Sequence, residues 1–127
     1  MSFRTDRVRL AILLKRNPTL TKEEFSQYWL GTHAALFSGL AIVKTNLLKY
    51  EQAHTNEPVL LQLAAAMGAP KSEWDGMAIF EAESYVKIFE IFQSEEYQKV
   101  VVPDEKHFIV RQASQALPLD LNTVLDQ

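Results

Sequence analysis

Four segments of the chain carry the short apolar or alternating patterns that predict β-strands. They are residues 8–14, 46–54, 77–83 and 107–116. The first is almost wholly apolar, which is typical of a buried strand, and Asn17-Pro18 follows it as a breaker. The second alternates with a period of two, so one face of that strand is expected to carry Leu48, Tyr50, Gln52 and His54.

A capping box and a helical stripe predict the first helix. Thr21 and Glu24 stand at the spacing that lets each side chain bond the backbone amide of the other. Apolar and aromatic side chains then recur at steps of three and four residues, at Phe25, Tyr28, Trp29, His33 and Leu36. We expect this stripe to face the sheet and Gly39 to end the helix.

A second main helix is predicted after Ser84, which is a favourable N-cap residue. The stripe that it buries is expected to be Tyr85, Ile88, Phe89 and Phe92. The helix should restart at Ser94-Glu95-Glu96, and Pro103-Asp104 is expected to end it. A short apolar helix over residues 58–66 is expected in the connection between the two middle strands.

The order strand, helix, strand in each half predicts a ferredoxin-like α+β fold, βαββαβ, with one antiparallel four-stranded sheet. We expect a single domain over residues 1–127, with its core over 7–116. Helices cover one face of such a sheet, yet these strands are apolar on both faces. A two-fold symmetric partner is therefore expected to bury the other face and form a dimeric α+β barrel. The tail, residues 117–127, contains alternating leucines and is expected to pack on that partner.

Composition narrows the chemistry. The chain has no cysteine, which excludes disulfides, thiolate metal sites, iron–sulfur clusters and cysteine nucleophiles, and fits a cytoplasmic protein. The net charge is −3 and the charges are interspersed, so neither nucleic acid nor a membrane surface is an expected partner. No apolar stretch approaches the ~20 residues that span a bilayer. Phosphate-loop, dinucleotide and Gly-x-Ser-x-Gly patterns are absent.

Several short motifs together resemble the EthD family. In the N-terminal half they are Leu14-Lys15-Arg16-Asn17-Pro18 and the spaced set Thr21, Glu24, Phe25, Tyr28, Trp29 and His33. In the C-terminal half they are Trp74-Asp75-Gly76, then Phe92, Ser94, Glu96 and Tyr97, then Val102-Pro103-Asp104-Glu105 with Phe108. The resemblance extends over residues 7–115, which is nearly the whole chain.

The resemblance is strongest to fungal members encoded beside aromatic polyketide synthases. It implies a small enzyme without a cofactor that acts on a polyphenolic polyketide in a pocket inside each barrel. Members of that group decarboxylate anthraquinone precursors such as atrochrysone carboxylic acid, or act as dehydratases. Related barrels include cyclases and cofactor-free anthrone monooxygenases. The resemblance thus favours a decarboxylase, with dehydration, cyclisation, oxygenation and a non-catalytic binding role as alternatives.

Three residues are the candidates for catalysis: His33, His107 and Tyr50. An imidazole titrates near neutral pH and can therefore give and take a proton. His33, on the helix stripe, is expected to be the proton donor of the reaction, and the resemblance includes this position. His107, expected at the start of the last strand, or Tyr50 would steady a developing oxyanion. Each histidine also has a structural interpretation, as a buried hydrogen-bonded ring for His33 and as an exposed strand end for His107.

Further residues are candidates for binding and positioning. A slot for a planar aromatic substrate is expected from Tyr28, Trp29, Trp74, Phe80 and Phe92, with His54 beside them, although aromatic residues at such spacing also form ordinary cores. Asp75 and Asp104 are placed to orient a histidine, but both positions also suit turns. The three histidines lack the spacing of a helical ligand pair, so no metal site is predicted.

Overall fold

The computed structural model of the chain describes residues 2–127 and contains one antiparallel sheet with the strand order β2-β3-β1-β4. The strands are β1 (Val8–Leu14), β2 (Leu47–His54), β3 (Gly76–Ala82) and β4 (Gln115–Leu119). This order and the helical connections confirm the predicted ferredoxin-like α+β fold.

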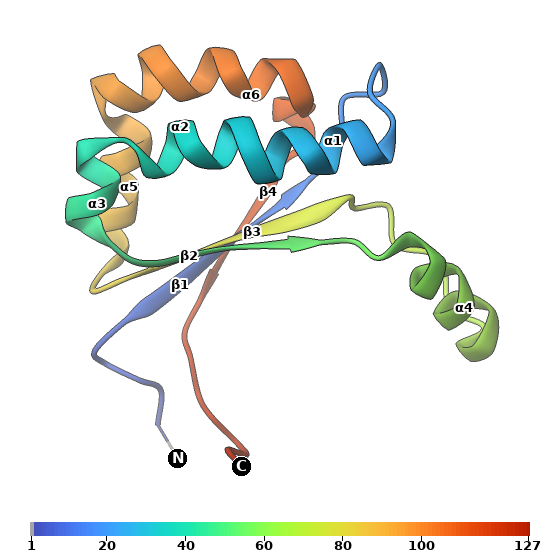
Figure 1. The fold of residues 1–127 in the computed structure, drawn as a ribbon. Helices are drawn as coiled ribbons and strands as arrows, with labels where there is room; N and C mark the ends of the chain where they lie inside the picture. The colour runs from blue at the N-terminus through green and yellow to red at the C-terminus, as the bar shows by residue number, and fades with distance from the viewer. Residues whose placement is uncertain (1) are drawn as a thin grey trace.

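The helices form a layer on one face of the sheet (Figure 1). The first long helix comprises α1 (Lys22–Tyr28), the π-helical turn η1 (Trp29–His33) and α2 (Ala34–Ser38), and α3 (Ala41–Asn46) follows it. The second comprises α5 (Tyr85–Gln93), the π-helical turn η2 (Tyr97–Val101) and α6 (Val102–Phe108). α4 (Glu57–Met67) projects from one end of the sheet, and the 3₁₀ turn η3 (Arg111–Ala113) precedes β4.

The predicted helix starts are confirmed. At α1 the Glu24 amide donates to the Thr21 hydroxyl at 3.1 Å, and the Thr21 amide donates to the Glu24 carboxylate at 2.8 Å. The Ser84 hydroxyl caps α5, and the Asn56 side chain caps α4. These caps use the backbone N–H groups that every helix start leaves without a partner, so the sequence signals have a direct physical cause.

The π-helical turn η1 corrects the predicted stripe of the first helix. Leu36 was expected to be buried, but it is 37% exposed, whereas Phe37 is 2% exposed. The Ala34 amide bonds to the Trp29 carbonyl, five residues back, so this turn holds more residues than an α-turn. The buried position is therefore displaced by one residue along the chain.

The second helical segment differs from its prediction in two ways. Ile88 is buried as expected, but Ile91 is buried beside it while Phe89 is 47% exposed. Pro103 does not end the helix and instead lies in the first turn of α6. The Val102 amide bonds to the Tyr97 carbonyl, five residues back, so η2 already departs from α-helical bonding where the proline ring enters.

The prediction of a last strand over residues 107–116 is wrong. His107 and Phe108 belong to α6, Ile109 makes only an isolated bridge to Arg16, and β4 begins at Gln115. β4 pairs with β1 in the register Ala11↔Leu117, so the first part of the predicted tail is an edge strand of this sheet. Because α6 continues past Pro103, the edge strand starts later than the apolar pattern indicated.

A register shift in β2 corrects the predicted strand face. Tyr50, Gln52 and His54 share one face as expected, and that face is turned toward the helix layer. The irregularity between Leu47 and Lys49 turns Leu48 outward instead, where it is 46% exposed. Leu47 packs against the core in its place. A bulge inserts one residue into a strand, and therefore reverses the facing of every residue before it.

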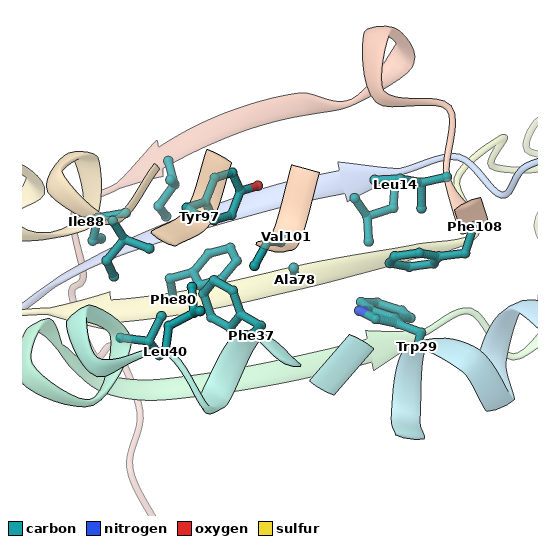
Figure 2. Packing of buried hydrophobic residues seen from close by; sticks show 14 of the residues in the cluster. Leu14, Trp29, Phe37, Leu40, Ala78, Phe80, Ile88, Tyr97, Val101 and Phe108 are labelled. Carbon is teal, nitrogen blue, oxygen red and sulfur yellow. The ribbon is translucent and has the colours of Figure 1, made fainter. Parts of the chain in front are cut away.

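The core between the sheet and the helix layer combines aliphatic side chains with large aromatic ones. Figure 2 shows Trp29 and Phe108 at one end of this layer and Phe37, Phe80 and Tyr97 at the other. Trp29 packs directly on Gly76, where a β-carbon would lie 2.5 Å from the indole ring. No helix within residues 2–127 has the length and apolar character needed to cross a membrane.

Candidate active site

A cavity of about 470 Å³ lies between the sheet and the helix layer. Its walls are mostly apolar and aromatic, formed by Leu10, Ile12, Leu14, Trp29, Phe37, Ala78, Phe80, Phe89, Phe92, Phe108, Ile109, Ala116 and Pro118. Its polar lining residues are His33, Tyr50, Tyr97, Gln98, Glu105, Arg111 and Ser114. An apolar cavity of this size with a few converging polar groups is the usual form of a small-molecule site.

His33 lines this cavity and is held by Asp104. His33 is 7% exposed, and its Nδ1 lies 2.7 Å from the Asp104 Oδ2. The Tyr28 hydroxyl donates to the other carboxylate oxygen. Phe108 packs against the imidazole with 4.7 Å between ring centroids. One buried carboxylate therefore fixes the histidine and the tyrosine together.

This geometry determines the tautomer of the neutral His33 ring. An ionised carboxylate can only accept hydrogen bonds, so Nδ1 carries the proton that Asp104 receives. The unprotonated Nε2 makes no hydrogen bond within residues 2–127. Burial, together with the bond to Asp104, raises the pKa of Tyr28 to about 12, so this phenol stays a donor. The group can accept a proton at Nε2 while Asp104 stabilises the resulting cation.

A second set of hydrogen bonds orients Tyr50. The Gln52 Nε2 donates to the Tyr50 hydroxyl at 3.0 Å and to the Trp29 carbonyl at 2.9 Å. The His54 Nε2 donates to the Gln52 Oε1 at 2.8 Å, and the Ser26 hydroxyl lies 3.1 Å from the His54 Nδ1. Burial lowers the pKa of His54, which favours the neutral ring in this arrangement.

Tyr50 is left as a hydrogen-bond donor at the cavity wall. Its oxygen accepts from Gln52, so the hydroxyl proton remains for another acceptor. Burial raises the pKa of Tyr50, which keeps the phenol protonated at neutral pH. The hydroxyl can therefore donate to an oxygen atom of a bound ligand.

Tyr97, Glu105 and Arg111 form a third polar group on the cavity. The Tyr97 hydroxyl donates to the Glu105 Oε2 at 2.5 Å, and the Arg111 Nε donates to the Glu105 Oε1 at 3.0 Å. Burial, and next the charge of Glu105, raises the pKa of Tyr97 well above its ordinary value. Tyr97 is therefore a permanent donor to Glu105, while Arg111 keeps its terminal nitrogens for other partners.

The structure brings several sequence-predicted residues to one place. The cavity walls include His33, Tyr50, Trp29, Phe80 and Phe92. Tyr28 and Asp104 lie immediately behind His33, and Asp104 accepts the histidine bond as a positioning carboxylate would. The helix stripe and the period-two strand were thus sufficient signals for Tyr28, Trp29, His33 and Tyr50.

Four predicted residues lie elsewhere. His107 is on α6 and not at a strand start, and its exposed ring packs on the outside of Tyr28 at 4.6 Å. His54 acts through Gln52 and does not line the cavity. Trp74 and Asp75 border a separate surface depression, where Asp75 accepts from the Arg16 amide at 2.8 Å and lies 3.5 Å from the Lys22 ammonium. Asp75 therefore orients no histidine among the described residues.

The group formed by Tyr97, Glu105 and Arg111 was not predicted from the sequence patterns. Tyr97 and Glu105 were part of the family-like motifs, yet no pattern connected them, because the expected helix end at Pro103 separated them. Arg111 was expected in the middle of a strand. No cluster of residues suited to holding a metal ion occurs within residues 2–127.

Comparison with known proteins identifies a matching family model and several solved structures with a similar fold. The model of the EthD domain matches residues 17–112. No curated protein matches the chain by sequence. An EthD family protein from Bacillus halodurans is 13% identical, with a TM-score of 0.61 over 91% of this chain and 99% of that chain.

Two enzymes are among the similar structures. Hydroxynitrile lyase from Passiflora edulis is 10% identical, with a TM-score of 0.62 over 97% of this chain and 100% of that chain. SnoaB, a cofactor-independent oxygenase from Streptomyces nogalater, is 9% identical, with a TM-score of 0.60 over 96% of this chain and 99% of that chain. A ferredoxin-like protein from Thermobifida fusca, described as dimeric, is 12% identical, with a TM-score of 0.59 over 95% of this chain and 96% of that chain. Identities this low show a shared fold only.

Proposed function

We propose that this chain, which belongs to the EthD family, is a cofactor-independent lyase. Its proposed reaction is the decarboxylation of an aromatic polyketide acid in the cavity between its sheet and helices. The observation that carries the proposal is His33, an imidazole on the wall of an aromatic cavity with Nδ1 bonded to Asp104 and Nε2 without a partner in the described chain. A histidine held in this way is equipped to move one proton.

The substrate supplies the electron sink. When the bond between a carbon atom and its carboxylate breaks, carbon dioxide leaves and the electron pair passes to an adjacent carbonyl as an enolate. A proton must then reach the carbon atom. The protonated His33 ring is proposed to deliver it from Nε2, and Asp104 stabilises the imidazolium that exists before the transfer.

Tyr50 is proposed to steady the enolate oxygen. Its hydroxyl proton is free because the oxygen accepts from Gln52, and its raised pKa keeps it protonated. A donor already aligned toward the developing charge does not need to reorganise during the reaction. The apolar aromatic walls disfavour the charged carboxylate relative to neutral carbon dioxide, which assists the same step.

We propose that the protein acts as a cytoplasmic homodimer. The outer face of the sheet carries Leu13, Met77, Ile79 and Leu117 in the registers of β1, β3 and β4. No helix of the described chain covers this face, as Figure 1 shows. The described dimeric state of the Thermobifida fusca protein with this fold supports the same arrangement.

Two alternative reactions use the same groups. In a dehydration, His33 would remove a proton from carbon and assist the loss of hydroxide, which its unpartnered Nε2 permits. In an oxygenation, the cavity would hold an ionised anthrone next to molecular oxygen. The similarity to SnoaB supports this alternative at the level of the fold. A binding protein without catalysis would use the cavity alone.

The test is incubation with a carboxylated aromatic polyketide followed by mass spectrometry of the product. We expect loss of carbon dioxide. Loss of water, or gain of oxygen, would replace the proposed reaction by one of the alternatives, and no mass change would favour a binding protein. His33→Ala should lower turnover by about 10²–10⁴-fold, the usual contribution of one positioned acid–base group.

The matched histidine control is His107→Ala, because the His107 ring is exposed and lies outside the cavity. We expect this variant to retain most of the wild-type turnover. Circular dichroism would show that both variants are folded. Full turnover by a folded His33→Ala protein would contradict the proposed mechanism.

A further inference from the structure

The mouth of the cavity contains a polar site that the proposed reaction does not use. It lies where η3 joins β4, next to the exposed residues Phe89, Gln98 and Pro118. Arg111 and Ser114 both line the cavity here. The 3₁₀ turn brings them together, because the Ser114 amide donates to the Arg111 carbonyl at 3.0 Å.

Arg111 is held in place at one end and free at the other. Its Nε donates to Glu105 at 3.0 Å, and Glu105 is itself fixed by the Tyr97 hydroxyl. The two terminal nitrogens of the guanidinium make no hydrogen bond within residues 2–127. Both Glu105 oxygens are occupied, so the carboxylate positions the guanidinium without using its terminal fork. That fork has the geometry that binds two oxygens of an anion.

Ser114 provides an independent observation at the same place. Its hydroxyl oxygen is buried and has no hydrogen-bond partner within the described residues. A buried polar atom left unpaired is costly and uncommon in native proteins. Rotation of the Ser114 side chain about χ1 toward the cavity, whose lining includes this residue, would bring the hydroxyl to a ligand oxygen bound at Arg111 and give it a partner.

The charge of the lining selects the kind of ligand. Arg111 is permanently cationic at neutral pH, and the other polar lining groups named above are neutral phenols, an amide, a hydroxyl, the imidazole and the already paired Glu105. The remaining walls are apolar and aromatic. The cavity therefore combines an apolar, largely aromatic interior with one cationic fork at its mouth.

We infer that Arg111 and Ser114 form a subsite for an anionic oxygen on a planar aromatic ligand, either a second carboxylate or an ionised phenol. The inference rests on the proposed function, because it orients the substrate of that reaction. The anionic oxygen is bound at the mouth and is kept in the product, while the reacting carbon lies deeper, toward His33. This subsite would select aromatic acids over neutral compounds of the same shape.

The test measures binding of anthracenecarboxylate and of its neutral amide, anthracenecarboxamide, by fluorescence titration. We expect the wild-type protein to prefer the carboxylate. Arg111→Gln should weaken carboxylate binding by roughly tenfold to a hundredfold, the range for losing charge-assisted hydrogen bonds, and should leave amide binding nearly unchanged. Dinitronaphtholate, ionised at neutral pH, serves as the phenolate arm and shows which source of anionic oxygen binds more tightly.

Two further variants make the result interpretable. Arg111→Lys keeps the charge but not the fork, and should retain part of the preference for the carboxylate. Arg4→Gln is the matched control, because Arg4 pairs with Asp6 at the exposed N-terminal segment, away from the cavity. It should bind both probes as the wild type does. The proposed subsite would be contradicted by equal binding of carboxylate and amide by the wild type. It would also be contradicted if Arg111→Gln kept the wild-type preference for the carboxylate.

The two proposals fail in different ways. If the preference depends on Arg111 but no carbon dioxide is released from a polyketide acid, the subsite stands and the reaction is wrong. If Arg111→Gln turns over the polyketide acid with an unchanged KM, the subsite is wrong and the reaction stands.

Discussion

At the scale of single residues, Asp104 connects the burial of charge with proton chemistry. Its carboxylate is nearly enclosed and accepts from the His33 Nδ1 and the Tyr28 hydroxyl. A buried carboxylate needs such partners, because leaving it unpaired would be very costly. The same bonds that satisfy the charge also set the ring orientation and the tautomer of His33. In the proposed reaction, the contact that satisfies the buried charge is therefore also the one that positions the histidine.

Asp104→Asn tests this coupling. The amide keeps the shape of the side chain, but its NH₂ group can donate to Nδ1, while its carbonyl oxygen accepts from Tyr28. The Nδ1 nitrogen then becomes the acceptor and the proton moves to Nε2. We expect turnover to fall by about 10²–10⁴-fold. Nitrogen NMR of labelled histidine should show the exchanged tautomer.

The matched control is Asp75→Asn, because Asp75 lies in the separate surface depression and contacts no histidine among the described residues. That variant should keep the wild-type tautomer at His33 and nearly full turnover. An Asp104→Asn protein with an unchanged tautomer would show that Asp104 does not set the state of the ring.

Among the secondary-structure elements, the two π-helical turns lie beside the cavity. η1 contains Trp29 and His33, and η2 begins at Tyr97, so both turns supply lining residues. A π-turn is less stable than an α-turn and commonly occurs at functional sites. In η1 the wider turn displaces the buried position of the helix from Leu36 to Phe37. η2 leads into the first turn of α6, which contains Pro103.

These turns explain which predictions from sequence succeeded. Strong local signals, such as the Thr21 capping box and the period-two face of Tyr50, determine structure within a few residues, and they placed His33 and Tyr50 correctly. A π-turn has no comparable signature, because it depends on packing against the sheet. The positions of Leu36, Arg111 and the last strand therefore could not be obtained from spacing alone. Asp104 was expected in a turn, yet it reaches His33 because α6 continues.

The helix α4 is attached by ion pairs and not by a core. Within the described chain no side chain of α4 is buried, and apolar residues such as Leu63 and Met67 are exposed. Glu57, at its first turn, accepts from the Lys22 ammonium at 2.8 Å and lies 2.6 Å from the Lys71 ammonium. These contacts, led by the bond from Lys22, lower the pKa of Glu57 from 4.5 to about 2.

The contribution of these ion pairs should depend on pH. Because the pKa of Glu57 is lower in the folded state, its stabilising effect is present above the unfolded value of 4.5 and is lost as the pH falls toward 2. Glu57→Gln should therefore reduce the hydrogen-exchange protection of α4 at neutral pH, and the difference from wild type should shrink across that interval. The melting temperature should change little, because α4 buries no side chain.

Glu95→Gln is the control for this effect, since Glu95 makes an exposed pair with Lys99 at 3.0 Å within the second helical segment. It should leave the protection of α4 unchanged at every pH. If Glu57→Gln loosened α4 equally at neutral pH and near the folded pKa, the ion pairs would not be what holds this helix.

At the scale of the whole molecule, the two faces of the sheet have different partners. The face toward the helices forms the walls of the cavity, through residues such as Leu10, Phe80 and Tyr50. The opposite face has charged residues at one end, where the buried Glu81 pairs with the half-buried Arg9 at 3.0 Å, and along β2, which carries Lys49 and Glu51. Between them lies an apolar patch on β1, β3 and β4. An apolar sheet face without a covering layer is expected to be buried by a second copy of the chain.

Leu117→Lys tests this arrangement. Leu117 is 44% exposed on the edge strand β4 and lies opposite Ala11 on the outer face, so a lysine there should be tolerated by a single protomer. In a dimer packed through this face, the charge would be taken out of water, or the two faces would have to separate. We expect sedimentation velocity to show a homodimer for the wild type and a shift toward monomer for the variant, with unchanged circular dichroism.

The control places the same charge on the opposite side of the fold. Val86 is 62% exposed on α5, away from the outer face of the sheet, so Val86→Lys should remain dimeric. A wild-type protein that sediments as a monomer would remove the need for a partner. A Leu117→Lys protein that stays fully dimeric would instead move the interface to another surface. Because the cavity lies on the helix side of the sheet, a monomeric Leu117→Lys protein should still bind aromatic ligands, so assembly and ligand binding can be measured separately.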